Sequence, residues 1–109
     1  MSILTLDTTY FTILQALGNV QETLEAAIRH YALTQIGDRI ATLQHEILTI
    51  QAQYGLPYAQ FYDRVTTDEQ YVIALRSTHP TWERDFNAWG YYVEELAEWL
   101  GRLTSIEGT

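Results

Sequence analysis

The chain of 109 residues contains no cysteine and no lysine, and it has only two prolines. Without cysteine it can form neither a disulfide nor a thiolate nucleophile. No apolar run is long enough to span a bilayer, and no basic-then-apolar leader precedes a small-residue cleavage site. We therefore expect a cytoplasmic protein that folds as one domain, or as a small domain with an appendage.

Positive charge is also scarce. Six arginines face 14 aspartates and glutamates, which gives a formal net charge of −8. A partner held mainly through phosphate groups needs cations to displace its counterions, so this balance argues against such a partner. It favours a basic protein partner or serves solubility alone, and composition leaves both readings open.

One strand-like pattern is present, in the opening stretch "ILTLD". Leu4 and Leu6 alternate with Ile3 and Thr5, which is the two-residue period of a strand with one buried face. No second run in the sequence offers a partner strand for its backbone groups. We expect it to pair with the same strand of another copy. The alternative is that residues 2–6 are a tail before a helical bundle.

The rest of the chain is predicted to be helical. Asp7 is placed to cap a helix over residues 8–17, which Gly18 ends. Asn19 and Glu22 have the spacing of a capping box at the start of the next helix. The inner side of the first helix is predicted to carry Tyr10, Phe11, Leu14 and Leu17.

The second helix is predicted to run over residues 20–54, unless Gly37 breaks it. Its apolar positions are Val20, Leu24, Ala27, Ile28 and Tyr31, followed by Leu33, Ile36, Ile40, Leu43, Ile47, Ile50 and Tyr54. Later boundaries are indicated by Gly55 as a terminator, Pro57 as a start, Thr66 with Glu69 as a capping box, and Pro80 as the last start.

The last helix has an apolar stripe with acidic shoulders. Its stripe is Trp82, Phe86, Trp89, Val93, Leu96, Leu100 and Leu103, at alternating spacings of four and three. Tyr92 and Trp99 flank this stripe. Such a pattern indicates either a core face or a binding face.

The order strand, helix, glycine-containing turn and helix resembles the ribbon-helix-helix family. The resemblance is carried by "ILTLD", the capped helix, "LGN" at the turn and "VQETLEAAIRHY". It implies a mainly α fold in which residues 1–50 form a homodimer through a two-stranded ribbon, and residues 51–109 form a helical extension. The dimer core would then contain Leu4, Leu6, Leu24, Ile28 and Tyr31.

The same resemblance implies a ribbon in the major groove of DNA. The residues in the corresponding places are Ile3, Thr5, Asn19 and Arg29. Base-reading members of the family carry basic or amide side chains on the strand, which this chain lacks. We therefore expect DNA binding to be weak, or to need a second protein that adds positive charge.

The second half, from "YGLPYAQFYDRV" to "HPTWERDFNAWGYYVEELAEWL", resembles the C-terminal region of type II antitoxins. This resemblance implies that the protein neutralises a small basic toxin by covering it. The candidate anchors are Trp82, Trp89, Tyr92 and Trp99, and the candidate steering cluster is Glu94, Glu95 and Glu98. For Trp82, Phe86 and Trp89, burial in the core is the competing interpretation.

No pattern indicates catalysis, a cofactor or a metal. His30, His45 and His79 lie far apart in the sequence, and there is no glycine-rich phosphate loop or nucleophile motif. The preferred hypothesis is therefore an antitoxin that is not an enzyme. The alternatives are a self-associating helical structural or adaptor protein, and a plain ribbon-helix-helix transcriptional regulator.

Overall fold

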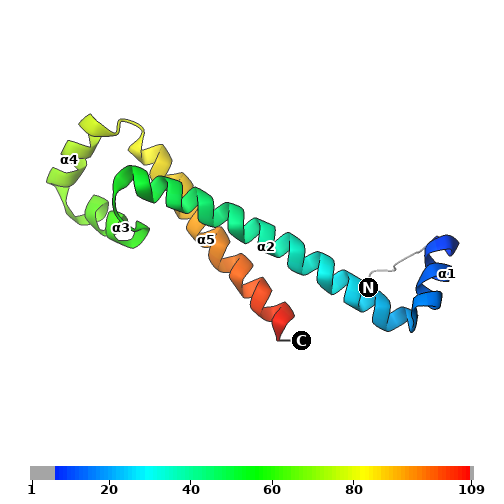
Figure 1. The fold of residues 1–109 in the computed structure, drawn as a ribbon. Coiled ribbons are helices and arrows are strands. Elements are labelled where there is room, and N and C mark those ends of the chain that lie inside the picture. The colour runs from blue at the N-terminus through cyan, green and yellow to red at the C-terminus, as the bar shows by residue number, and fades with distance from the viewer. Residues whose placement is uncertain (1–6, 109) are drawn as a thin grey trace. The chain divides into compact units, whose positions relative to one another are not determined.

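A computed structural model describes residues 7–108, and every regular element in that range is an α-helix (Figure 1). The elements are α1 (Thr8–Leu17), α2 (Val20–Tyr54), α3 (Tyr58–Thr67), α4 (Glu69–Thr78) and α5 (Trp82–Glu107). The mainly α class is therefore confirmed. No helix in this range is long and apolar enough to cross a membrane.

The predicted ribbon-helix-helix fold is wrong, because residues 7–108 contain no strand. Ile3 to Leu6 lie outside the described residues, and Asp7 caps α1, as predicted. A five-residue alternation is a short signal, and the partner groups that a ribbon needs for its backbone were expected from another copy of the chain. Because the ribbon fold is not found, the resemblance to the antitoxin family loses its structural basis.

Local capping explains where the first helices begin. The Asp7 carboxylate accepts a hydrogen bond from the Thr9 backbone N–H at 2.8 Å. The Asn19 side chain accepts one from the Glu22 N–H at 3.1 Å. Gly18 between the two helices has φ 141°, a conformation that side-chain-bearing residues rarely adopt. Both predicted starts are confirmed.

Helix α2 is one uninterrupted helix of 35 residues, so Gly37 does not break it. Gly55 ends it with φ 75°, as predicted. The predicted capping box of Thr66 and Glu69 is wrong: the Asp68 side chain caps α4 by accepting from the Tyr71 N–H at 3.1 Å. Helix α5 begins at Trp82, shortly after the predicted start at Pro80.

The chain divides into two compact units, Met1–Gln35 and Ile36–Thr109. The predicted division at residue 50 separated a dimerisation segment from a partner-binding segment, and that functional division stays a prediction.

The C-terminal unit is built around an aromatic core. Phe61 and Trp89 are fully buried, and Leu75 completes the cluster. The Trp89 ring centroid lies 5.2 Å from that of Phe61 and 5.3 Å from that of Tyr58. These separations are typical of favourable aromatic pairs, which add to the free energy gained by burying the rings. Farther along α2, the buried residues are Ile36, Ile40 and Leu43.

The described part of the N-terminal unit, residues 7–35, has no such core. None of the described residues 7–35 is buried. Several of its largest apolar side chains are mostly exposed, namely Tyr10, Phe11, Ile13, Leu17, Ile28 and Tyr31. In α1 and the first part of α2, these apolar side chains are therefore left without cover from the rest of the unit.

Gly90 is the position where the backbone of α5 comes closest to an aromatic ring. A Cβ at Gly90 would lie 2.8 Å from the Tyr58 hydroxyl oxygen, whereas a Cβ at Gly101 would have no atom within 4 Å. The Tyr58 ring packs against Trp89 and Phe86, so it has little freedom to move away.

We expect Gly90→Ala to be less stable than Gly101→Ala by about 1–3 kcal/mol, because only the former overpacks the core. Both changes gain similar helix propensity, so Gly101→Ala is the matched control. The free energy of unfolding in urea, followed by tryptophan fluorescence, measures the difference. Adding Tyr58→Phe to Gly90→Ala removes the clashing oxygen and should recover most of the loss; no recovery would contradict this account.

Candidate interaction surface

Helix α1 presents an uncharged apolar side. Its segment TTYFTILQAL contains no charged residue. Tyr10, Ile13, Leu14 and Leu17 recur at spacings of three and four, which places them along one side of the helix. Leu14 is half-buried and the other three are exposed. An amphipathic helix of this kind normally packs its apolar side against another element.

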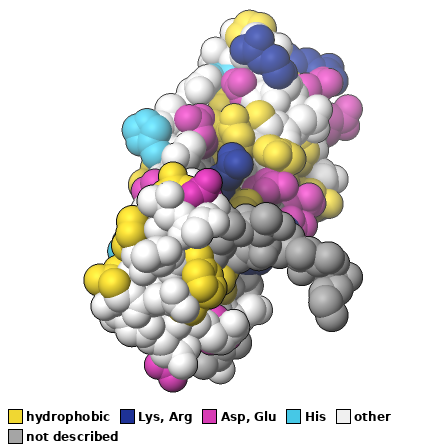
Figure 2. Space-filling model, turned by 90° about the vertical axis from the view of Figure 1, so that its right-hand side faces the viewer, with side chains coloured by type: hydrophobic (Ala, Val, Ile, Leu, Met, Phe, Trp, Pro, Cys, Tyr) yellow, Lys and Arg dark blue, Asp and Glu magenta, His cyan; other side chains and the backbone are white. Residues whose placement is uncertain are grey.

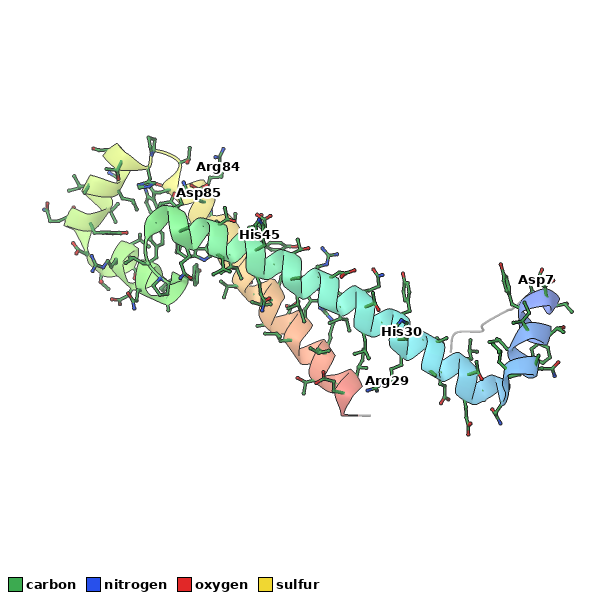
Figure 3. All side chains as sticks on the ribbon, in the orientation of Figure 1. Asp7, Arg29, His30, His45, Arg84 and Asp85 are labelled. Atoms are coloured by element: carbon green, nitrogen blue, oxygen red, sulfur yellow. The ribbon has the colours of Figure 1, made fainter. Side chains whose placement is uncertain are left out.

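The first part of α2 repeats this arrangement. Ile28 and Tyr31 lie on the same side of the helix as Val20 and Leu24, by the same spacing rule. Its charged residues, Glu22, Glu25 and Arg29, fall on the opposite side, because they are offset from that row by about half a turn. Figure 3 labels Asp7, Arg29 and His30 in this unit.

The apolar side of α2 changes between Tyr31 and Ile36. The two residues are five positions apart, which is about 140° beyond a full turn at 3.6 residues per turn. Leu33, Ile36, Ile40 and Leu43 then continue on the new side, and the last three are buried. The apolar residues predicted along the whole helix therefore do not form one continuous seam, and the row ending at Tyr31 is separate from the buried row.

We define the N-terminal stripe as the six side chains with the largest exposed apolar area in this unit. They are 42–72 % exposed, and hydrophobic side chains reach the molecular surface among acidic ones in the space-filling view (Figure 2). Its members are Tyr10, Phe11, Ile13, Leu17, Ile28 and Tyr31. This stripe is the candidate interaction surface.

The structure brings together part of the predicted dimerisation set. Ile28 and Tyr31 belong to the N-terminal stripe, and Leu24 is half-buried beside them. Leu4 and Leu6 lie outside the described residues. Of the α1 members of the stripe, Tyr10, Phe11 and Leu17 were expected on an inner side and Ile13 was not singled out, so the sequence analysis missed them as surface residues. Their lack of any charged neighbour on α1 was the available signal.

The residues predicted to bind DNA were grouped because of the resemblance to a ribbon-helix-helix fold, which is not the fold found. Ile3 and Thr5 lie outside the described residues. Asn19 is occupied as the cap of α2. Arg29 is exposed and takes part in an interaction of its own. The role of these residues toward DNA stays a prediction.

The predicted partner anchors on α5 divide into core and surface. Trp89 is fully buried, so this side chain belongs to the core and not to a binding face. Trp82 is half-buried, with its ring 6.5 Å from Phe61 and 6.2 Å from Phe86. Tyr92 is half-buried against Tyr91 at 5.9 Å.

Trp99 is held within its own chain by two arginines. The Arg102 guanidinium lies 4.4 Å from the Trp99 ring centroid and that of Arg39, on α2, lies 5.7 Å away. Both distances suit cation–π contacts. Arg102 also pairs with Glu98 at 3.7 Å. Of the predicted steering cluster, Glu94 and Glu98 are exposed and Glu95 is half-buried. Their role toward a partner stays a prediction.

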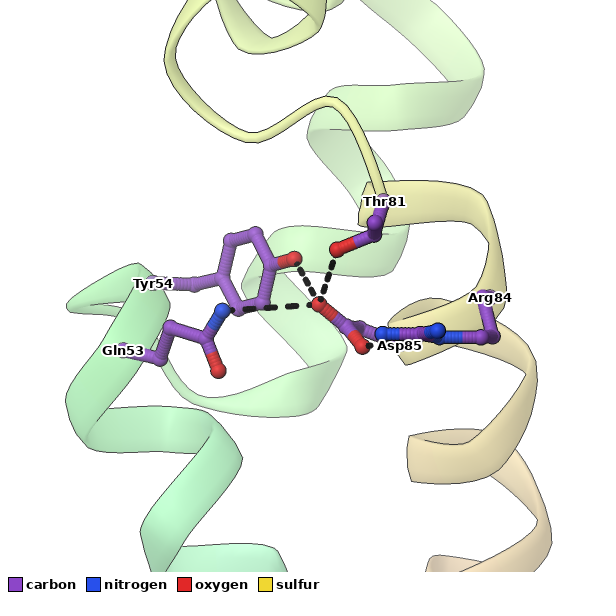
Figure 4. Close-up of polar contacts among 5 residues, drawn as sticks. All are labelled: Gln53, Tyr54, Thr81, Arg84 and Asp85. Atoms are coloured by element: carbon purple, nitrogen blue, oxygen red, sulfur yellow. Dashed lines mark hydrogen bonds and ion pairs between the residues drawn. The ribbon is translucent and has the colours of Figure 1, made fainter.

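A polar cluster joins the end of α2 to the start of α5 (Figure 4). The Asp85 carboxylate accepts hydrogen bonds from the Tyr54 hydroxyl at 2.5 Å, the Thr81 hydroxyl at 3.3 Å and the Gln53 amide at 3.4 Å. The Arg84 Nε atom lies 3.9 Å from the Asp85 Oδ1 atom. Burial, followed by the bond to Asp85 and its negative charge, raises the pKa of Tyr54 above its ordinary value. The cluster fastens two helices and presents no free nucleophile.

Among residues 7–108, no three histidine, aspartate or glutamate side chains converge as ligands of a metal would. His45 lies on α2, whereas His79 stacks on Tyr54 at 4.6 Å between ring centroids. Comparisons with protein-family models, curated proteins and solved structures found no match to this chain. A function for this chain is therefore inferred from the N-terminal stripe itself.

The Tyr54–Asp85 contact predicts an alkaline loss of stability. The pKa of Tyr54 is higher in the folded than in the unfolded chain, so its contribution is complete below about pH 10 and is lost as the pH rises further. We expect the free energy of unfolding to fall above about pH 10, and to fall less steeply in Tyr54→Phe. At neutral pH this variant should lose about 1–2 kcal/mol.

Urea unfolding at a series of pH values measures both effects. Tyr91→Phe is the matched control, because the Tyr91 ring is 59 % exposed. Equal alkaline slopes for Tyr54→Phe and the unmodified chain would show that the Tyr54 hydroxyl is not the responsible group.

The Trp99 contacts predict an energetic coupling between Trp99 and Arg102. Arg102→Met should lower the free energy of unfolding by about 0.5–1 kcal/mol, and by much less when Trp99 is already leucine. Glu98→Gln controls for the exposed ion pair, which we expect to contribute little. A double-mutant cycle from urea unfolding measures the coupling; a coupling of zero would rule the contact out as a stabilising one.

Proposed function

We propose that this chain is a non-catalytic protein-interaction module of the adaptor kind. Its C-terminal unit is a helical unit with a buried aromatic core. Its N-terminal unit carries the surface that another polypeptide covers. The observation that carries the proposal is the N-terminal stripe: six large apolar side chains, 42–72 % exposed, in a unit whose described residues 7–35 include none that is buried.

The energetics support a covered stripe. Fully burying one large apolar side chain is worth about 1.5–3 kcal/mol, and six such side chains leave roughly half of that gain unused. Monomeric proteins rarely expose a contiguous apolar patch larger than a few hundred Å² unless it binds something. On each helix most of these residues recur at spacings of three and four, so they lie along one side of that helix and are not scattered around it.

Toxin neutralisation is not carried into this proposal. The expectation of a toxin partner depended on the resemblance to ribbon-helix-helix antitoxins, and that fold is not the one found. Protein binding does not depend on the resemblance, because an exposed apolar surface needs only a complementary partner.

Site-specific photo-crosslinking in cells tests the proposal. A photoreactive phenylalanine analogue at Tyr10 or Tyr31 lies in the stripe, whereas the same analogue at Thr12 or Glu22 lies on the polar side of the same helix. We expect a crosslinked protein species from the two stripe positions and not from the two controls. Absence of any species at the stripe positions, or equal yields at all four, would refute the proposal.

A further inference from the structure

We infer that the polypeptide covering the N-terminal stripe is a second copy of this chain. The inference rests on the proposed function, since it names the partner of the same surface. Two copies would each contribute α1 and the first part of α2, and the four helices would enclose both stripes in a bundle with a two-fold axis.

The area of the stripe fits a stable dimer. Its six side chains are 42–72 % exposed. Taking roughly 200 Å² for each complete side chain, the stripe offers about 700 Å² per copy. A stable interface of standard size buries about 800 Å² on each partner. The stripe alone therefore approaches the required area without contributions from the C-terminal unit.

The charge distribution fits a second copy better than it fits other occupants. The whole chain carries −8, so two copies repel each other, and an uncharged contact face adds no close like-charge contact to this repulsion. The stripe contains no charged residue, and Glu22, Glu25 and Arg29 occupy the other side of α2. In a two-fold interface the same patch meets itself, which an uncharged apolar patch tolerates. Two copies can therefore associate through the stripe, whereas the acidic remainder of the surface disfavours contact with a second copy.

The same distribution disfavours a lipid surface as the occupant. Helices that lie on membranes carry lysine and arginine on their polar side, where they meet anionic headgroups. Here that side has Glu22 and Glu25 against Arg29, and the chain has no lysine. A partner with strong charge is also disfavoured, because the stripe offers it no complementary group.

The test is the mass of the purified full chain in solution, by sedimentation equilibrium across the micromolar range. We expect a dimer of twice 12.6 kDa. Leu17→Glu places a charge in the stripe, and two such charges face the same interface in the dimer. It should weaken association by about a hundredfold or more. Thr12→Glu adds the same charge on the polar side of α1 and should leave the mass unchanged.

Tyr31→Ser is a second stripe variant, on α2, and should also yield monomers. Circular dichroism and the fluorescence of buried Trp89 verify that each variant keeps its helices and its C-terminal core. A monomeric unmodified chain would overturn the inference, and so would a dimer that Leu17→Glu and Tyr31→Ser leave intact.

The outcomes separate this inference from the proposed function. A monomer whose stripe positions crosslink to a different polypeptide in cells rejects the second copy but keeps the interaction module. A monomer without such crosslinks rejects both. Sedimentation with phosphatidylcholine–phosphatidylglycerol vesicles is run in parallel. A monomeric chain that binds them, and loses binding in Leu17→Glu, replaces the second copy by a lipid surface and overturns the inference.

Discussion

The five-residue step between Tyr31 and Ile36 determines how this chain can bury its apolar side chains. Up to Tyr31 the apolar row of α2 lies on one side, and from Ile36 it lies about 140° further round. The later row is buried in the C-terminal unit, whereas the earlier row stays exposed. Since a helix cannot turn both rows toward one neighbour, one of them needs a second surface.

The C-terminal unit solves its packing with a few aromatic rings. Burying Trp89 and Phe61 completely removes several hundred Å² of apolar surface from water, which is worth about 25 cal/mol for each Å². The indole N–H of Trp89 has no hydrogen-bond partner among the described groups, a cost of about 1–3 kcal/mol. The apolar gain exceeds this cost, so the ring can occupy the centre of the core. The Tyr54–Asp85 contact then ties α2 to α5 at the edge of that core.

Much of the helical layout was predictable from sequence, because local chemistry controls it. Asp7 and Asn19 cap their helices by contacts within three residues, and Gly55 adopts the conformation that ends α2. The predicted ribbon was wrong: every regular element in residues 7–108 is a helix, and the signal for a strand spanned only five residues. The family resemblance failed for the same reason, since its first element was that strand.

The sequence by itself determined where the helices lie, how acidic the chain is and which residues form apolar rows. Only the tertiary structure decided which rows are covered. The α5 row containing Trp89 became core, although its Trp and Tyr content equally suited a binding face. Tyr10 and Leu17 on α1 became surface, although they were expected to lie inward. The physical reason is that apolar spacing indicates which side chains need burial. Which residues cover them depends on contacts with distant parts of the chain or with another molecule.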